Sequence, residues 1–277
     1  LIVKNIEPTV LRRIDRKVGV NIGFPIKHNY KLVLEGSYIN NRDQYLNSKV
    51  LISTDTLDQL RLSGSRVGLS FSTNTLNRKQ YASVGKFFSF GFDWFDLNEN
   101  LEPGNTSLIT EEATKNRTWL RAKVSLEQYF KRGIYSSGYF FEGVLSSQPV
   151  FMNYGGTIIN APSFNPIHDS RTLLLENFRA FNYVAGGWRN VFSLCKSLDF
   201  RLEGYLFKPI QSIVMDQNQE AALNDDITNI YFAATAGLVL HSTVGPISLS
   251  VNYYDDKQNK LGVLLHVGFL LFNKTSL

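Results

Sequence analysis

The stretch that decides the fold lies near the end of the sequence and reads KLGVLLHVGFLLF, from Lys260 to Phe272. It is too short to cross a membrane as a helix, which needs about 20 apolar residues. Because successive side chains of a strand point to opposite faces, its alternation predicts a strand with one apolar face. The apolar parity holds Leu261, Val263, Leu265, Val267, Phe269 and Leu271, and the other parity holds Gly262, His266 and Gly268.

The same alternation recurs along the whole chain, and no amphipathic helix of normal length interrupts it. The composition agrees with many strands, since 13% of the residues are aromatic and only 19% are charged. The sequence therefore predicts an all-β protein. Ten earlier stretches alternate, at residues 17–24, 31–40, 65–73, 86–95, 119–128, 137–145, 182–194, 199–207, 231–240 and 246–254.

The connections between these stretches alternate between short and long. Barrels of the bacterial outer membrane have this pattern, because they have short periplasmic turns and longer outer loops. Alternation of side chains alone would also suit a soluble β-sandwich with one wet face. A sandwich, however, has no reason to place its long loops on every second connection.

Charged residues in mid-strand fall on the parity opposite to the apolar residues. A charge on a lipid-facing position near the bilayer midplane costs about 2–4 kcal/mol, so these side chains are expected to face the lumen of a barrel. They are Glu35, Arg121, Lys123, Glu127, Glu142, Arg201 and Glu203.

The predicted fold is therefore a transmembrane antiparallel up-and-down β-barrel of about 12 strands. Eleven strands follow from the alternation, and closed single-chain bacterial barrels have even strand numbers. The twelfth strand is expected either in residues 1–8 or upstream of them. The last strand is expected to pair with the first, because an open sheet edge cannot face lipid.

The final strand also resembles the C-terminal assembly signal of outer-membrane barrels. That signal has a polar residue, a glycine two positions on and apolar residues five and seven positions on. The matching residues are Lys260, Gly262, Leu265 and Val267, with Phe269 following on the apolar face. His266, on the other parity, is expected to face the lumen.

A further resemblance lies in STNTLNRKQYASVGKFFSFGFDWF, Ser72 to Phe95. This stretch is similar to a hairpin of the bacterial surface-antigen barrels, the superfamily of outer-membrane assembly and two-partner secretion proteins. In that family an inward-reaching sixth outer loop precedes five closing strands, as the connection from Ser146 to Phe181 does here. The Val-Arg-Gly-Phe/Tyr motif of that loop is absent from this chain, which weighs against a direct role in protein assembly.

Residues 178–192, 199–209 and 245–277 resemble one branch more closely, the C-terminal barrel of Bacteroidota patatin-like phospholipase proteins. The resemblance implies that residues 1–277 form a single outer-membrane barrel domain, the C-terminal part of a longer protein. They would be the last eleven or twelve strands of a sixteen-stranded barrel. It also implies an upstream patatin-like lipase domain, a lipid acyl hydrolase, which the barrel anchors or exports.

The chain itself carries no recognisable catalytic motif. The nearest match to a lipase Gly-x-Ser-x-Gly elbow is at Gly64 to Gly68, where Ser65 is one place too early and lies within an alternating strand. His168 beside Asp169 is interpreted as part of a polar loop. The single cysteine, Cys195, excludes an internal disulfide and a multi-cysteine metal site. We therefore expect no cofactor and no bound metal.

The sequence thus favours a non-catalytic membrane module, with two alternatives left open. These are an outer-membrane protein assembly or secretion barrel and a passive porin-like channel. Expected partners are outer-membrane lipid, lipopolysaccharide and the outer-membrane assembly machinery, with a homodimer also open. The net charge of +5 comes without a basic cluster interleaved with aromatic residues, so no nucleic acid is expected.

Overall fold

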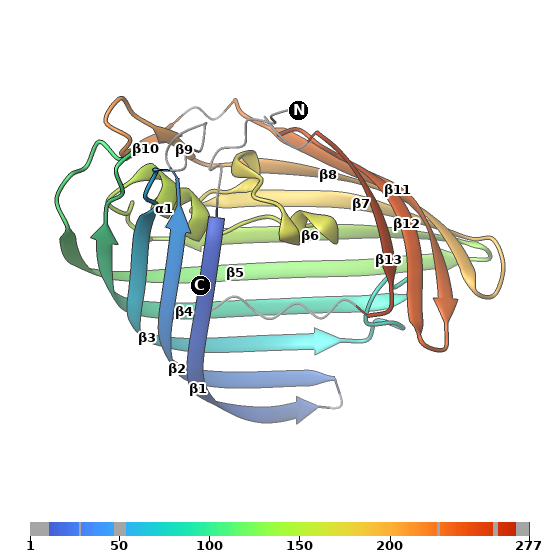
Figure 1. Ribbon diagram of the computed structural model, residues 1–277. Coiled ribbons are helices and arrows are strands. Elements are labelled where there is room, and N and C mark those ends of the chain that lie inside the picture. The colour runs from blue at the N-terminus through green and yellow to red at the C-terminus, as the bar shows by residue number, and fades with distance from the viewer. Residues whose placement is uncertain (1–10, 28, 47–53, 226–227, 257–259, 270–276) are drawn as a thin grey trace.

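The computed structural model describes residues 11–27, 29–46, 54–225, 228–256, 260–269 and 277 (Figure 1). In this part of the chain one curved sheet of eleven strands dominates. Its strands are β1 Leu11–Lys27, β2 Tyr30–Tyr45, β3 Asp58–Asn74, β4 Gly85–Glu102, β5 Ala113–Arg132, β6 Tyr135–Ser146, β7 Tyr183–Ser193, β8 Leu198–Pro209, β11 Tyr231–Ser242, β12 Gly245–Tyr254 and β13 Leu261–Val267.

All neighbouring strands of this sheet are antiparallel, and they follow one another along the chain except where β8 pairs with β11. Between those two strands lies a small separate hairpin of β9, Ser212–Met215, and β10, Ala221–Asn224. Each of the eleven stretches predicted from alternation coincides with one strand of the sheet. The predicted all-β, up-and-down fold is therefore confirmed.

The connections separate the sheet into two ends, as the sequence predicted. We call one the short-turn end, where residues 28–29, 75–84, 133–134, 194–197 and 243–244 join strands. The other is the long-loop end, with residues 46–57, 103–112, 147–182, 210–230 and 255–260. The longest connection, residues 147–182, lies inside the curve of the sheet (Figure 1). It contains α1, Tyr154–Asn160, and two turns of 3-10 helix, η1 Asp169–Thr172 and η2 Glu176–Phe178.

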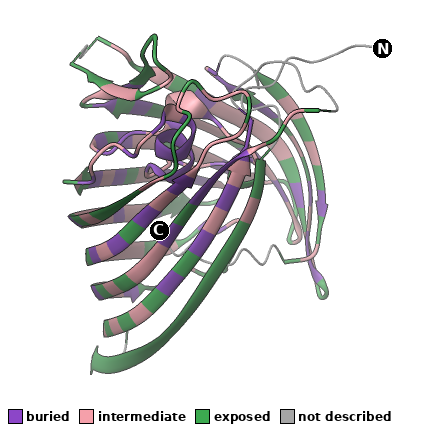
Figure 2. Ribbon diagram, turned by 60° about the vertical axis from the view of Figure 1, so that its left-hand side comes forward, coloured by how far each residue is buried: buried purple, intermediate pink, exposed green. Residues whose placement is uncertain are grey.

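The outer face of the sheet is apolar and exposed, and Figure 2 shows exposed and buried positions alternating along the strands. On β5 the outward residues from Leu120 to Phe130 are apolar except for Gln128, which accepts a hydrogen bond from Tyr139 Oη. That stretch spans about 34 Å along the strand, or about 24 Å at a tilt of about 45°. This agrees with the apolar band of outer-membrane barrels, which is about 25 Å tall.

The strands β4 and β5 continue beyond this apolar band toward the long-loop end. Their outward residues there are polar and bond across the pair, as where the Asn100 amide donates to Thr114 Oγ1 at 3.0 Å. Asn116 Nδ2 likewise donates to Asp96 Oδ1 at 3.2 Å. Alternation of apolar outward residues could not reveal these extensions. Outside the apolar band the outward residues are polar and the inward residues, such as Leu97 and Leu101, are apolar.

The order of the sheet begins at β1 and ends at β13, and no pairing between the described residues of these two strands is seen. The proposed twelfth strand, residues 1–8, lies outside the described residues, as does Leu271. Closure of the barrel by the last strand therefore stays a prediction. No helix within the described residues is long and apolar enough to cross a membrane.

Candidate functional site

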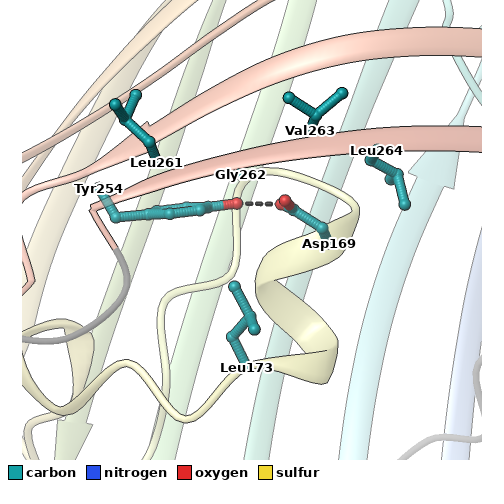
Figure 3. Close-up of a pocket in the computed structure, with 7 residues that line it drawn as sticks. All are labelled: Asp169, Leu173, Tyr254, Leu261, Gly262, Val263 and Leu264. Carbon is teal, nitrogen blue, oxygen red and sulfur yellow. Dashed lines mark hydrogen bonds between the residues drawn. The ribbon is translucent and has the colours of Figure 1, made fainter. Parts of the chain in front are cut away.

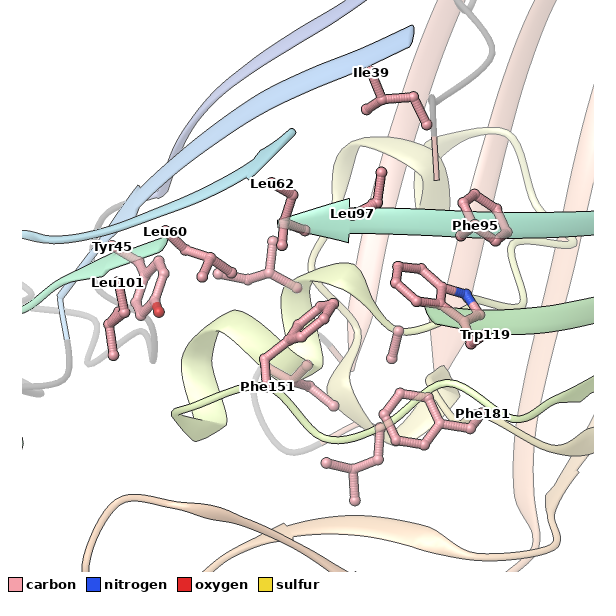
Figure 4. Packing of buried hydrophobic residues seen from close by; sticks show 14 residues of the cluster. Ile39, Tyr45, Leu60, Leu62, Phe95, Leu97, Leu101, Trp119, Phe151 and Phe181 are labelled. Atoms are coloured by element: carbon pink, nitrogen blue, oxygen red, sulfur yellow. The ribbon is translucent and has the colours of Figure 1, made fainter. Parts of the chain in front are cut away.

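The candidate site is the concave face of the sheet together with the segment inserted into it, residues 147–182, here called the inserted segment. One side of this segment packs against β2 to β5 near the long-loop end (Figure 4). Trp119 stacks on Phe95 with ring centroids 4.7 Å apart and meets Phe151 of the inserted segment edge-on at 6.1 Å. The cluster is Ile39, Tyr45, Leu60, Leu62, Phe95, Leu97, Leu101, Trp119, Phe151, Ile158, Ile159, Ala161, Phe181 and Ile213.

The other side of the inserted segment packs against β6 to β12. Phe164 stacks on Phe207 of β8 at 5.8 Å, and Phe178 lies edge-on to Tyr254 of β12 at 6.3 Å. The segment thus supplies apolar side chains to both halves of the core. The second cluster is Val144, Phe164, Ile167, Leu175, Phe178, Ala180, Tyr183, Ala185, Tyr205, Phe207, Ala233 and Tyr254.

Asn153 fixes the start of α1 to the sheet. Its Oδ1 accepts hydrogen bonds from Gly156 N at 2.8 Å and from Tyr45 Oη at 2.5 Å. Its Nδ2 donates to Asp58 Oδ2 at 3.0 Å. A Cβ at Gly156 would lie 2.7 Å from Leu60 Cδ2 and 3.0 Å from Tyr45 Oη. The helix therefore sits so close to β2 and β3 that a larger residue would have to displace their side chains.

The end of α1 is held by hydrogen bonds of Asn160 and Arg179. Asn160 Nδ2 donates to Asp43 Oδ2 at 2.9 Å, and Arg13 Nη2 donates to Asn160 Oδ1 at 2.5 Å. Arg179 Nη1 donates to the carbonyl oxygens of Ile158, Ile159 and Ala161, which are free at a helix C-terminus. Burial lowers the pKa of Arg179 to about 10. The inserted segment is therefore a packed part of the fold rather than a loose loop.

In mid-strand, on the short-turn side of the apolar clusters, the concave face carries a row of paired charges that crosses the strands. We call this row the charge belt. From β1 to β5 its signs alternate. Lys17 pairs with Glu35, Arg66 lies 3.5 Å from Glu35 and 2.7 Å from Asp93, and Arg121 lies 3.4 Å from Asp93. The guanidinium of Arg121 also lies over the Phe95 ring at 4.8 Å. Each of these charges thus has an opposite charge on the next strand.

The belt continues from β5 to β8. Lys123 Nζ lies 3.0 Å from Glu142 Oε1, which also accepts a hydrogen bond from Tyr183 Oη at 2.7 Å. Arg189 contacts Glu127 at 2.5 Å, and Arg201 contacts Glu203 at 2.8 Å. Burying ions costs several kcal/mol each, so only such mutual pairing makes this arrangement tolerable.

Two glycines make room for tyrosines beside the belt. A Cβ on Gly187 would lie 2.2 Å from Tyr205 Cδ1, and one on Gly138 would lie 2.5 Å from Tyr129 Cδ1. Both rings therefore lie along the sheet, and their hydroxyls accept hydrogen bonds from Arg189 at 2.7 and 3.2 Å. Gly187 thus allows the Tyr205 ring to pack closely against β7.

The turn formed by residues 75–84 folds inward at the short-turn end. Arg201 Nη1 donates to the Ala82 carbonyl at 2.9 Å, and the hydroxyls of Tyr81 and Ser248 are 2.8 Å apart. Arg78 Nη1 lies 3.0 Å from Asp199 Oδ2, which is 2.7 Å from His241 Nε2. This turn thus ties β8, β11 and β12 together across the mouth.

The tip of the inserted segment meets this turn. The ring of His168 lies edge-on to Tyr81, with centroids 4.7 Å apart, and burial lowers the pKa of His168 to about 4. Asp169 accepts a hydrogen bond from Tyr254 Oη (Figure 3). It accepts another from Asn252 Nδ2, which also lies on β12. A cavity of about 230 Å³ beside Asp169 opens toward β13. The His168–Asp169 pair is therefore a joint between the inserted segment and the sheet.

The other residues considered for chemistry lie apart from this joint. Ser65 is in the middle of β3 and not at a strand-to-helix turn, and Cys195 is exposed in the turn after β7. Among the described residues, no group of three or more His, Cys, Asp or Glu is arranged to hold a metal ion.

All seven charges expected in the lumen lie in the charge belt on the concave face. Four members were not predicted: Lys17, Arg66, Asp93 and Arg189. Asp93 and Arg66 stand on polar parities, so a wider reading of the alternation would have found them. Arg189 follows two glycines that break the apolar pattern of β7, which hid it. That the concave face is the lumen of a closed barrel stays a prediction.

The residues of the expected assembly signal lie on and around β13. Leu265, Val267 and Phe269 are exposed on the outer face, and Lys260 and Gly262 lie at the start of the strand. His266 points the other way and is buried. The placement suits the predicted apolar face, and the signalling role itself stays a prediction.

The sequence matches no protein-family model and no curated protein. Among solved structures, the crystal structure of BamA from Haemophilus ducreyi lacking POTRA domains 1–3 aligns with 92% of this chain. The TM-score is 0.56 at 9% identity. The chain has the fold of an outer-membrane β-barrel.

The likeness to BamA shows the fold alone, and the chain spans only 53% of the length of that BamA chain. A second match is the transport unit of the autotransporter AIDA-I from Escherichia coli. It covers 91% of this chain and 80% of that one at 13% identity, but its TM-score of 0.44 is too low to support an argument.

Proposed function

We propose that the chain is the non-catalytic barrel module of a bacterial outer-membrane protein, closed at rest by its own inserted segment. The observation that carries the proposal is the packing of that segment on both sides, through the two apolar clusters. A passive porin needs a water-filled lumen. Here the inserted segment packs apolar side chains against the concave face of the sheet.

The outer location rests on the fold, on the exposed apolar band and on the alternation of turns and loops. Separation of cell membranes by density would test it. The module is expected in the dense outer-membrane fraction, and recovery in the soluble fraction would contradict the proposal.

Conductance across planar bilayers tests the closed state. The wild-type protein is expected to give no stable open level. Gly156→Val is expected to give openings, because its side chain would collide with Leu60 and Tyr45 and displace α1. Gly36→Val is a matched control, since a Cβ at Gly36 meets nothing within 4 Å. A stable open conductance of the wild type would favour the porin instead.

Within this proposal the barrel serves either to anchor and export an attached domain or to assist protein assembly or secretion. The sequence resemblance supports the first, with a patatin-like lipase as the attached domain. The likeness to BamA is compatible with the second role. In that role the outer-membrane assembly machinery would be the partner. The absent loop motif weighs against a direct assembly role.

The intact mass of the protein in native outer membranes distinguishes these forms. A mass equal to that of the 277-residue chain would contradict an attached lipase. A much larger mass, with a Gly-x-Ser-x-Gly elbow in the additional sequence and lipase activity that the 277-residue module lacks, is the expected result for the anchor.

A further inference from the structure

The short-turn end carries a rim of exposed basic residues. Lys79 lies in the inward turn, Lys86 lies near the start of β4, Lys131 and Arg132 end β5, and Lys196 lies in the turn after β7. We call these five residues the basic rim. In the described part of this end the acidic side chain is Asp199, which is buried and lies 3.0 Å from Arg78. The exposed charge of the rim is therefore positive throughout.

The long-loop end has an even balance of exposed charges. Its exposed basic side chains are Arg12, Arg61, Lys115, Lys208 and Lys260. An equal number of exposed acidic side chains stands at the same end, namely Glu111, Glu112, Asp216, Glu220 and Asp225. The excess of positive charge is thus a property of the short-turn rim and not of the whole surface.

Next to the basic rim, outward-facing aromatic rings form contacts from strand to strand. Ring centroids lie 5.8 Å apart for Tyr30 and Phe71, and 6.2 Å apart for Phe71 and Phe88. Aromatic side chains gather at the headgroup level of membranes. Further pairs are Phe130 with Tyr139, Tyr135 with Phe192 and Phe192 with Phe200.

The cations lie one step beyond these rings. Lys86 is two residues from Phe88 and Arg132 is two residues from Phe130 on the same outward parity, which places their backbones about 7 Å further along the strand. Long basic side chains at that level reach lipid phosphates, while their aliphatic stems stay on apolar surface. These cations lie just beyond aromatic rings on the lipid-facing side of the sheet. This position favours lipid headgroups over an acidic protein as the binding partner of the basic rim.

We propose that the basic rim binds the headgroups of anionic phospholipids in the leaflet that surrounds the short-turn end. The inference rests on the proposed function, since it requires the band to span a bilayer. Phosphate oxygens accept charge-assisted hydrogen bonds from Lys and Arg. The anionic lipids would thereby fix the depth and the orientation of the barrel in its membrane.

Lipid selectivity in reconstituted vesicles tests the inference. The protein is placed in phosphatidylcholine vesicles, and electron spin resonance measures how strongly spin-labelled phosphatidylglycerol and phosphatidylcholine associate with it. The wild type is expected to prefer phosphatidylglycerol by about threefold or more, and salt is expected to reduce this preference.

Two triple variants with equal charge changes complete the test. Lys86→Gln/Arg132→Gln/Lys196→Gln is expected to lower the preference to about onefold. Arg12→Gln/Lys115→Gln/Lys208→Gln, at the long-loop end, is expected to retain it. Heat-modifiable migration on gels verifies that each variant is folded.

Equal association of both lipids with folded wild-type protein would overturn the inference and leave the proposed function standing, with an acidic protein as the remaining occupant. Equal losses in the two triple variants would also overturn it, since they would indicate net charge and not the rim. Failure of the folded protein to enter the phosphatidylcholine bilayer would contradict the proposed function and this inference together.

Discussion

Two regions of the same concave face are built from opposite kinds of side chains. Near the long-loop end the face is apolar, and residues such as Leu60 and Leu97 pack against the inserted segment. In mid-strand the face is charged, and residues such as Arg66 and Glu203 belong to the charge belt. The apolar region is buried and the belt is mostly half-buried, so one region excludes charge and the other consists of it.

The difference shows that the composition of each region depends on which side chains pack against it. Where the inserted segment supplies apolar side chains, burial of apolar area stabilises the contact at about 25 cal/mol per Å². In the belt, each charge meets an opposite charge on its own strand or on a nearby strand of the sheet. The second arrangement contributes little net stability but makes every member costly to remove.

The largest expected effect comes from breaking the belt. Glu203→Leu removes the carboxylate that lies 2.8 Å from Arg201 and 3.7 Å from Arg189, leaving two buried guanidinium groups with fewer partners. The free energy of unfolding is expected to fall by about 3–5 kcal/mol. Urea titration of protein folded in lipid vesicles measures it.

Two comparisons control this prediction. Adding Arg201→Met is expected to restore part of the loss, because it removes one unpaired cation. Glu111→Leu, at an exposed acidic position, is expected to change the free energy by less than about 0.5 kcal/mol. A loss below 1 kcal/mol in Glu203→Leu would mean that the belt is solvated.

The apolar region is tested by Ile158→Ala in α1. Ile158 is 1% exposed and belongs to the first cluster. Loss of its buried methyl groups and the resulting cavity are expected to cost about 3 kcal/mol, within the usual range of about 2–5. The same urea titration applies, with Leu108→Ala as the exposed control. Equal small effects at both positions would show that the inserted segment packs loosely.

These two regions also differ in how far the sequence predicted them. The belt could be found, because Arg121 or Glu142 in mid-strand opposes apolar neighbours and a lipid-facing charge is costly. The apolar region could not, because Ile39 and Leu62 stand on the same inward parity as those charges. Only the inserted segment makes inward apolar residues necessary, and its contacts join residues more than a hundred positions apart, such as Tyr45 and Asn153.

A pH dependence is expected at the tip where the inserted segment meets the belt. Burial lowers the pKa of His168 to about 4, against about 6.5 in the unfolded chain, with Arg171, Arg189 and Arg201 acting in the same direction and Glu203 opposing. The unfolded state therefore binds more protons between these values, and stability falls as the pH is lowered through this window. Between pH 7.5 and pH 4.5 the loss is about 2–3 kcal/mol.

Urea midpoints of the wild type and of His168→Phe at the two pH values measure this contribution. The variant keeps an aromatic ring against Tyr81 but cannot titrate. Its pH-dependent loss is expected to be smaller than that of the wild type by about 2–3 kcal/mol. Identical pH dependence in both proteins would show that His168 is solvated.

The smallest expected effect concerns the hydrogen bonds of Asn153, which hold the start of α1 against β2 and β3. Asn153→Ala removes the cap of Gly156 N and leaves Tyr45 Oη and Asp58 with one partner fewer. A lost cap with buried polar groups is expected to cost about 1–2 kcal/mol. Asn116→Ala, in the outward polar ladder of β5, is expected to cost less than about 0.5 kcal/mol. If the two losses were equal, the hydrogen bonds of Asn153 would add no stability beyond the apolar packing. The inserted segment would then be held by its side chains in the two apolar clusters alone.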